Sequence, residues 1–270
     1  MKRKAIAETA LVAMIIAIVG GLVIAAVTTT LVLRGKEHID LAACKSNVVL
    51  AIQSKEKNPF GTQVVPIDKC FTEQQGVLEV SKPGKYSDEM SQQVARLLHD
   101  CRYQFGEIEG TPWTGGVWSS PTVCFVCSNF KLPARESSSD GLKATDLLAW
   151  MRAHTDTQGK TYYDYLLPSI PFRDMDYLLM SSFDRDNNVA YTLDELRPNE
   201  PYAVVNIAIP KKRSEQVFGS TVGKLADGTR RVATIDFSSI KDGISWVAIV
   251  KNKNLGSTCG VQFTRYTSNG

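Results

Sequence analysis

The stretch that decides the fold is an amphipathic run, SDEMSQQVARLLHDCRYQF, from Ser87 to Phe105. Its apolar residues recur at steps of three and four residues, which predicts a helix with one buried face. That face consists of Met90, Val94, Leu97, Leu98, Cys101 and Phe105. Gly106 follows directly and predicts the end of the helix. A β-branched and aromatic run, VCFVCSNFKL, from Val123 to Leu132 then predicts a strand.

Around this helix and strand, the rest of residues 61–270 mixes short strands with a few helices. The expected helices are 143–154 and 172–181, and the expected further strands are 62–67, 76–80, 202–209, 231–237, 244–251 and 259–266. Asp-Gly and Asn-rich turns bound the later strands. Because strands and helices do not alternate as regular βαβ units, the pattern predicts one α+β domain over residues 61–270.

The chain has six cysteines, which predict up to three disulfides. They are Cys44, Cys70, Cys101, Cys124, Cys127 and Cys259. Cys101 lies on the apolar face of the predicted helix, and Cys124 and Cys127 lie in the predicted strand. We therefore expect a bridge from Cys101 to Cys124 or Cys127 that joins the helix to the sheet. Such a bridge closes a loop of about 25 residues and stabilises the fold by about 3 kcal/mol.

Cys124 and Cys127 also have the spacing of a redox-active pair, which suggests an exported thiol–disulfide enzyme as an alternative. That chemistry favours a helix N-terminus, where the helix dipole lowers a thiol pKa, whereas this pair lies in a strand-like run. A zinc site needs four ligands, and no second close pair of Cys or His accompanies it.

A run of 25 residues without a charge extends from Thr9 to Leu33. A helix of that length is long enough to cross a hydrocarbon core of about 30 Å. We therefore expect a basic cytoplasmic N-terminus (1–8), a transmembrane helix (9–33) in the lipid bilayer, a juxtamembrane helix (34–60) and an extracytoplasmic domain. A cleaved secretory signal is the competing interpretation, although its apolar core is usually about 7–15 residues long.

The charge balance supports this topology. The chain carries 31 Lys+Arg against 28 Asp+Glu, and residues 1–38 hold five of the bases and two of the acids. That leaves 26 of each for residues 39–270, so the whole net charge of +3 flanks the apolar run. The basic bias before the run favours a cytoplasmic N-terminus, and the cysteines favour an oxidising compartment for the domain. A domain with no net charge also argues against a nucleic acid partner.

Two resemblances accompany these features. The start, with a basic leader before Ile6-Ala7-Glu8 and an apolar run, resembles the class III signal of type IV pilin-like proteins. The resemblance implies leader cleavage after Ala5 and a filament subunit. Glu8 is third after that cut rather than fifth as in typical pilins.

The second resemblance rests on the cysteines behind a single N-terminal anchor. Cys44, Cys70, the run from Cys101 to Gly106, and Cys124-Phe-Val-Cys127 resemble uncharacterised single-pass surface proteins of small-genome archaea. This resemblance implies export and paired cysteines, and it carries no activity over.

One segment fits the spacing of a calcium-binding EF-hand loop. The ligands would be Asp184, Asp186, Asn188, the carbonyl of Ala190, Thr192 and Glu195. Val189 stands where the sharp turn of that loop prefers Gly, and Pro198 shortens the exit helix. Asp and Asn are also ordinary turn residues, so a polar hairpin is the other interpretation.

The sequence names no nucleophile, base and orienting group together, and it lacks the phosphate-binding and hydrolase motifs. His99 and His154 are expected to be structural, the latter at a helix C-terminus. Trp113 and Trp118 suit either a sugar-binding surface or the core. We therefore expect a non-catalytic structural or binding role at the cell surface, with a protein or glycan partner. The alternatives are the filament subunit and the thiol–disulfide enzyme.

Overall fold

The structure is a computed structural model, and the chain divides into two compact units, Met1–Ala43 and Cys44–Gly270. It describes residues 41–51, 70, 72–81, 85–105, 122–134, 141–166, 179–184, 189–210, 223–224, 230–231, 243–259 and 261–263. The predicted membrane segment 9–33 and the predicted cleavage after Ala5 lie outside the described residues. Residues 41–51, within the predicted juxtamembrane segment, are helical. No helix in the described part of the chain is both long enough and apolar enough to cross a bilayer.

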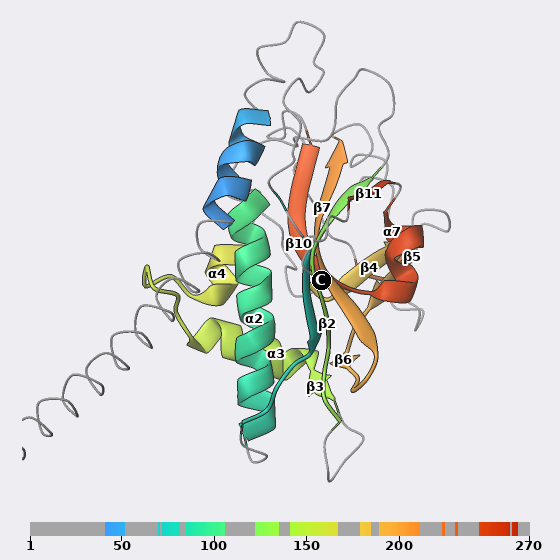
Figure 1. The fold of residues 1–270 in the computed structure, drawn as a ribbon. Coiled ribbons are helices and arrows are strands. Elements are labelled where there is room, and N and C mark those ends of the chain that lie inside the picture. The colour runs from blue at the N-terminus through green and yellow to red at the C-terminus, as the bar shows by residue number, and fades with distance from the viewer. Residues whose placement is uncertain are drawn as a thin grey trace, which may run out of the picture. The chain divides into compact units, whose positions relative to one another are not determined.

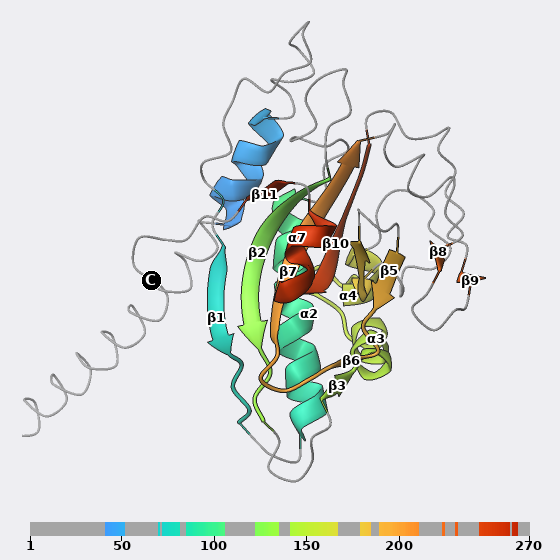
Figure 2. The same ribbon diagram turned by 90° about the vertical axis from the view of Figure 1, so that its right-hand side faces the viewer.

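The second unit is an α+β fold built on a mixed sheet (Figure 1). The strands β1 (Glu73–Val77), β2 (Val123–Lys131), β7 (Pro201–Pro210) and β10 (Gly243–Lys251) lie in that order. β7 runs antiparallel to both β2 and β10. β1 and the short strand β11 (Val261–Phe263) both run parallel to β2 along the same edge, as Figure 2 shows. The α+β prediction is therefore confirmed.

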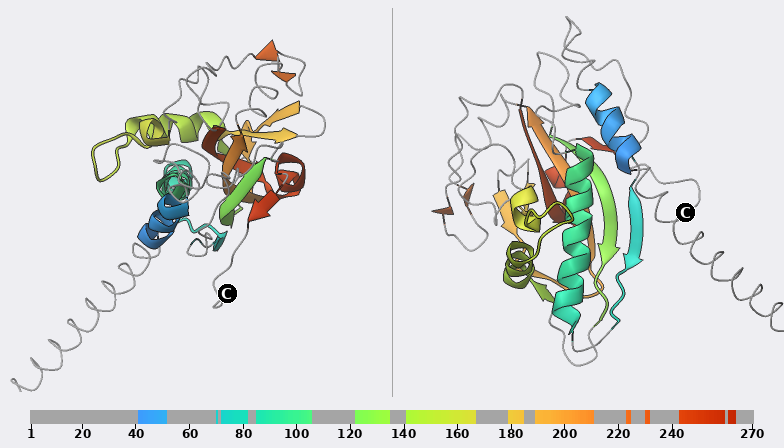
Figure 3. Two further views of the ribbon diagram at one scale, coloured as in Figure 1. Left: turned by 90° about the horizontal axis from the view of Figure 1, so that it is seen from above. Right: turned by 90° about the vertical axis from the view of Figure 1, so that its left-hand side faces the viewer.

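Helices lie on both faces of this sheet. The helix α2 (Tyr86–Phe105) lies along one face, and the short helix α7 (Leu255–Thr258) lies on the opposite face (Figures 1 and 3). α3 (Ala144–Ala153) and α4 (Tyr162–Leu166) pack beside α2. Because both faces are covered, every residue of β7 from Tyr202 to Ile209 is buried, which is why its sequence is continuously apolar apart from one asparagine.

Three small two-stranded sheets complete the described elements. They pair β3 (Leu142–Lys143) with β6 (Glu195–Leu196), β4 (Ser181–Asp184) with β5 (Val189–Thr192), and β8 (Gly223–Lys224) with β9 (Arg230–Arg231). A 3-10 turn, η3 (Asn252–Asn254), connects β10 to α7. Before β3, a methyl group on Gly141 would lie only 1.8 Å from the carbonyl oxygen of Leu196, so the approach of these two segments requires glycine.

The long elements agree with the sequence predictions, and the short ones deviate. Predicted helix 87–105 and predicted strand 123–132 match α2 and β2 to within one residue. The strand predicted at 76–80 instead spans Glu73–Val77, because Gly76 adopts a positive φ of 64° and carries a register shift within the strand. Most of the helix predicted at 172–181 lies outside the described residues, and its last residue, Ser181, begins strand β4.

Candidate functional site

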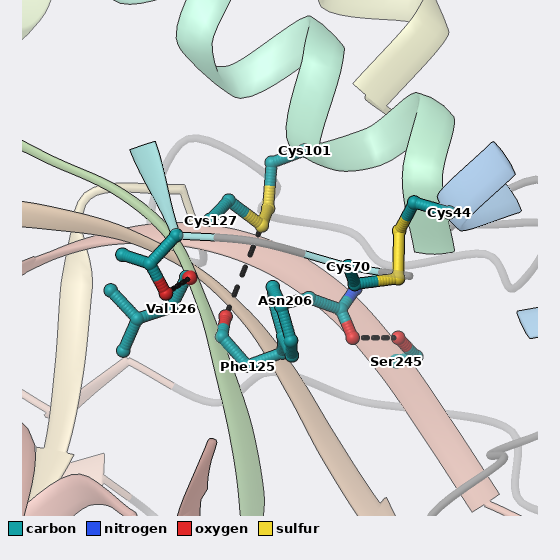
Figure 4. Close-up of a disulfide and its surroundings, with 9 residues drawn as sticks. Cys44, Cys70, Cys101, Phe125, Val126, Cys127, Asn206 and Ser245 are labelled. Atoms are coloured by element: carbon teal, nitrogen blue, oxygen red, sulfur yellow. Dashed lines mark hydrogen bonds between the residues drawn. A yellow bond between two sulfur atoms is a disulfide. The ribbon is translucent and has the colours of Figure 1, made fainter. Parts of the chain in front are cut away.

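All six cysteines are paired in three disulfides within the second unit. Cys101–Cys127 joins α2 to β2, which confirms the predicted bridge between helix and sheet and selects Cys127 as the partner. Cys124–Cys259 joins β2 to the end of α7, and Cys44–Cys70 joins the helix containing residues 41–51 to the segment before β1. Figure 4 shows Cys101–Cys127 and Cys44–Cys70 close to α2. All six side chains are buried.

The pairing overturns the hypothesis of a redox pair between Cys124 and Cys127. Successive side chains of a strand point to opposite faces, so residues three positions apart lie on different sides of the sheet. Phe125 packs against Phe105 of α2, with ring centroids 4.6 Å apart, and Cys127 lies on the same face. Cys124 points to the other face, toward α7. A strand therefore separates the two thiols that a redox pair would bring together.

Strand β2 has a bulge at Cys127, and the side chain of Thr72 makes a hydrogen bond to the strand at this bulge. The β2–β7 register shifts between Val126 and Ser128. At this point the hydroxyl of Thr72 donates a 2.6 Å hydrogen bond to the carbonyl oxygen of Val126, which bridges the gap between β1 and β11 along β2. The buried Asn206 on β7 accepts a 3.1 Å hydrogen bond from Ser245 of β10 on the face that α2 covers.

Aromatic and histidine rings gather where α2, α3 and α4 meet. We call this group the aromatic cluster and define it as His99, Trp150, His154, Tyr162 and Tyr165. Its rings form a continuous series of contacts. His154 stacks on Trp150 at 4.0 Å, Trp150 contacts Tyr162 at 5.4 Å, Tyr162 contacts His99 at 5.6 Å, and His99 stacks on Tyr165 at 4.2 Å. Two of the three histidines in the chain therefore belong to one cluster.

His99 lies between two carboxylates at the inner end of this cluster. Its Nδ1 is 3.3 Å from Asp100, and its Nε2 is 3.7 Å from Oδ2 of Asp156. Asp156 shapes the loop between α3 and α4, because its Oδ1 accepts hydrogen bonds from the backbone N–H groups of Gln158 and Lys160. Only 5% of the Asp156 side chain is exposed, so the loop places a buried carboxyl group beside the imidazole.

His154 forms the junction between α3 and α4 at the outer end of the cluster. The carbonyl oxygen of Trp150 accepts two hydrogen bonds from His154, one from the backbone N–H at 3.1 Å and one from the ring Nδ1 at 2.8 Å. The carbonyl oxygen of His154 accepts a hydrogen bond from the backbone N–H of Tyr162 at 3.0 Å. The indole Nε1 of Trp150 is fixed in turn by a 2.8 Å hydrogen bond to Asp88 on α2. The imidazole of His154 therefore occupies the C-terminal end of α3, as the sequence predicted.

A second polar group lies where β7 begins and β10 ends. Lys251 donates to both carboxylate oxygens of Glu200, at 3.0 and 2.8 Å, and the buried Tyr202 hydroxyl donates to Glu200 at 2.9 Å. Burial pushes the pKa of Glu200 upward, but these hydrogen bonds and the charges of Lys251 and Lys253 outweigh it and lower that pKa below 4.5. Burial also raises the pKa of Tyr202, and Glu200 adds to that rise. This group is a structural ion pair that joins adjacent strands.

The described residues of the predicted calcium segment lie mainly in two antiparallel strands that pair with each other. Asp184 ends β4, and Ala190 and Thr192 lie in β5, with Asp184 opposite Val189. Glu195 lies in β6, which belongs to a different two-stranded sheet. Its carboxylate accepts a 2.5 Å hydrogen bond from the backbone N–H of Gly141. Asp186 and Asn188 lie outside the described residues. Calcium binding stays a prediction, which calorimetric titration of the protein with Ca²⁺, with Asp186→Ala as control, will test.

Trp113 and Trp118 lie outside the described residues. Among the residues that the structure describes, no group of three or more His, Cys, Asp or Glu side chains is arranged to hold a metal ion.

Comparison with known proteins finds no matching family model, no similar curated protein and no similar solved structure. Function must therefore be argued from the chain itself. The fold and its cysteines define a disulfide-linked α+β protein with an aromatic cluster on one side.

The aromatic cluster as a unit was missed by the sequence analysis. His99, Trp150 and Tyr162 belong to three different helices, and no local spacing brings them together. The available signal was the tyrosine-rich segment 161–167 between two predicted helices, with His154 and Asp156 just before it.

Proposed function

We propose that this chain is a membrane-anchored extracytoplasmic protein with a non-catalytic structural or binding role at the cell surface. Residues 9–33 anchor it in the lipid bilayer, the N-terminus is cytoplasmic, and the domain after residue 60 faces the outside. A protein or a glycan is its partner.

The observation that carries this proposal is the complete pairing of the cysteines. All six form disulfides inside one compact unit, and all are buried. Stable disulfides form in oxidising compartments and are rare in the cytosol. The uncharged run of 25 residues before that unit supplies the anchor, and the bases around it supply the orientation.

Protease accessibility on intact cells tests the topology. External protease should degrade the domain without lysis, and a membrane-impermeant thiol reagent should label the protein only after reduction. A domain that stays protected until the cells are lysed, or that carries free thiols when isolated under alkylating conditions, would contradict the proposal.

The intact mass and N-terminal sequence of the native protein test its processing. The proposal expects residues 9–33 to be retained and the mass to be lower than that of the reduced chain by the six hydrogens of three disulfides. A mature N-terminus at Ile6 would favour the pilin-like alternative, and cleavage within the apolar run would favour a secretory signal.

A further inference from the structure

We propose that the second unit is a load-limiting link between the membrane anchor and a partner, and that residues 71–100 are the part of it that yields first under tension. The inference rests on the proposed function, because the bilayer holds the N-terminal side of the chain and a partner bound to the domain pulls on the other side. It adds a mechanical role to the surface role proposed above.

The chain is fixed to the second unit where it enters. Cys44 is bonded to Cys70, and both Cys44 and Val48 belong to the buried core. The helix containing residues 41–51 is therefore part of the domain rather than a loose stalk. Tension that arrives from the anchor crosses the Cys44–Cys70 bond and bypasses residues 45–69.

Residues 71–100 leave β2 and return to the same place on it. β1 begins at Glu73, which pairs with Ser128 of β2. At the other end of the segment, Cys101 is bonded to Cys127, the neighbour of Ser128 along the strand (Figure 4). Because both ends lie beside β2 at this point, the folded segment adds little length to the link. Fully extended, its 30 residues span about 100 Å.

Beyond this segment the load is divided between two stretches of chain. Cys101–Cys127 carries it to β2, and Cys124–Cys259 closes a loop that contains α3, α4, β7 and β10. A partner bound within that loop pulls on two arms at once, one leading back to β2 and the other to Cys259. Residues 71–100 carry the whole tension along a single chain, because no disulfide spans them.

Noncovalent contacts alone hold this segment on the sheet. The hydroxyl of Thr72 donates to the carbonyl oxygen of Val126 at 2.6 Å, and the N–H of Leu78 donates to the carbonyl oxygen of Lys131 at 2.9 Å. The apolar face of α2 adds three fully buried side chains, Met90, Val94 and Leu98. These contacts keep the segment closed at low tension. Their loss lets it extend by a fixed length that the two flanking disulfides set.

Optical tweezers on the full-length oxidised protein in detergent test the proposal. Ser46→Cys and Gln158→Cys, both at exposed positions, supply the two free thiols for the DNA handles, because all six native cysteines are paired. The first extension step should correspond to the 30 residues of the segment, or about 100 Å. A step about twice as long would mean that the shorter arm, residues 128–157, opens together with the segment, and it would overturn the proposal.

A matched pair of insertions identifies the segment that extends. A ten-residue Gly-Ser repeat inserted after Ser81 should lengthen the first step by about 35 Å, whereas the same repeat inserted after Ala134, in the shorter arm, should leave that step unchanged. Ser81 and Ala134 are both exposed, and near-ultraviolet circular dichroism verifies that each variant is folded. A first step that lengthens with the insertion after Ala134, or that ignores the insertion after Ser81, also overturns the proposal.

The outcome separates this inference from the proposed function. The tweezers measure purified protein, so the length of the first step does not depend on the topology in the cell. A domain that is external on intact cells but opens in one long step overturns the mechanical role alone. A domain that is protected on intact cells removes the source of the tension and overturns both.

Discussion

Two regions of the second unit are held together by different means. Around β2 and β7, which α2 and α7 cover from opposite faces, apolar burial and two disulfides hold the elements together. Where α3 and α4 meet α2, no disulfide is present, and stacked rings, single hydrogen bonds and the His99–Asp156 pair take their place. The first region is linked covalently, whereas the contacts named in the second are noncovalent. The comparison teaches that α2 is fixed to the sheet by a covalent bond and to α3 and α4 by ring contacts and hydrogen bonds.

The largest expected effect comes from removing the long-range disulfide. Cys124→Ala with Cys259→Ala opens a loop with a sequence separation of 135, and the unfolding free energy should fall by about 5 kcal/mol in the chain-entropy model. Cys101→Ala with Cys127→Ala, whose separation is 26, should cost about 3.5 kcal/mol. Urea denaturation of each variant at pH 7 measures the difference.

The third bridge is the matched control for that series. Cys44–Cys70 has the same separation of 26 as Cys101–Cys127. If loop closure sets the cost, the two variants should agree to within about 1 kcal/mol. A much smaller loss for Cys44→Ala with Cys70→Ala would mean that local packing, rather than loop length, decides how much each bridge contributes.

The next effect concerns the glycine that precedes β3. Gly141→Ala places a methyl group against the backbone of Leu196, and the clash should lower the unfolding free energy by about 2–3 kcal/mol. Gly256→Ala, where no atom lies within 4 Å of the new methyl group, is the control and should change it by less than about 1 kcal/mol. Equal losses in thermal or urea unfolding would show that close approach does not explain Gly141.

A smaller, pH-dependent effect is expected at the ion pair between the strands. Glu200→Gln should cost about 1 kcal/mol at pH 7, a value reduced because Glu200 and Lys251 are each about one-fifth exposed. The pKa of Glu200 is lowered on folding, so its contribution is present above pH 4.5 and is lost as the pH falls. Urea unfolding of both proteins at pH 7 and pH 3 should therefore converge at the lower pH. A constant difference would contradict the ionic origin.

The smallest expected effect lies at the contact between α2 and Trp150. Asp88→Ala removes the acceptor of the indole N–H and a favourable charge in the first turn of α2. Asp88→Asn keeps an acceptor oxygen and removes only the charge. The difference between the two variants in unfolding free energy, measured by urea denaturation at pH 7, should be about 0.5–1 kcal/mol.

The sequence by itself determined the elements whose signal is local. Helix α2 was predictable because one face of a long helix must be apolar at regular steps, and β2, β7 and β10 because buried strands need β-branched and aromatic residues. The even cysteine count predicted up to three disulfides, and three are present. The shift of β1 was not predictable, because Gly76 carries a bulge within the strand where the sequence suggested a start.

Only the tertiary structure decided which distant groups meet. The alternation of faces along β2 sends Cys127 to α2 and Cys124 to α7, and neither partner is close in sequence. His99 meets Asp156 across 57 residues because α3 and α4 pack beside α2, and that packing depends on how the helices cross rather than on any local spacing. Local patterns determine an element and its buried face. Contacts between elements depend on the whole chain, which is why the pairings and the aromatic cluster emerge only in the folded protein.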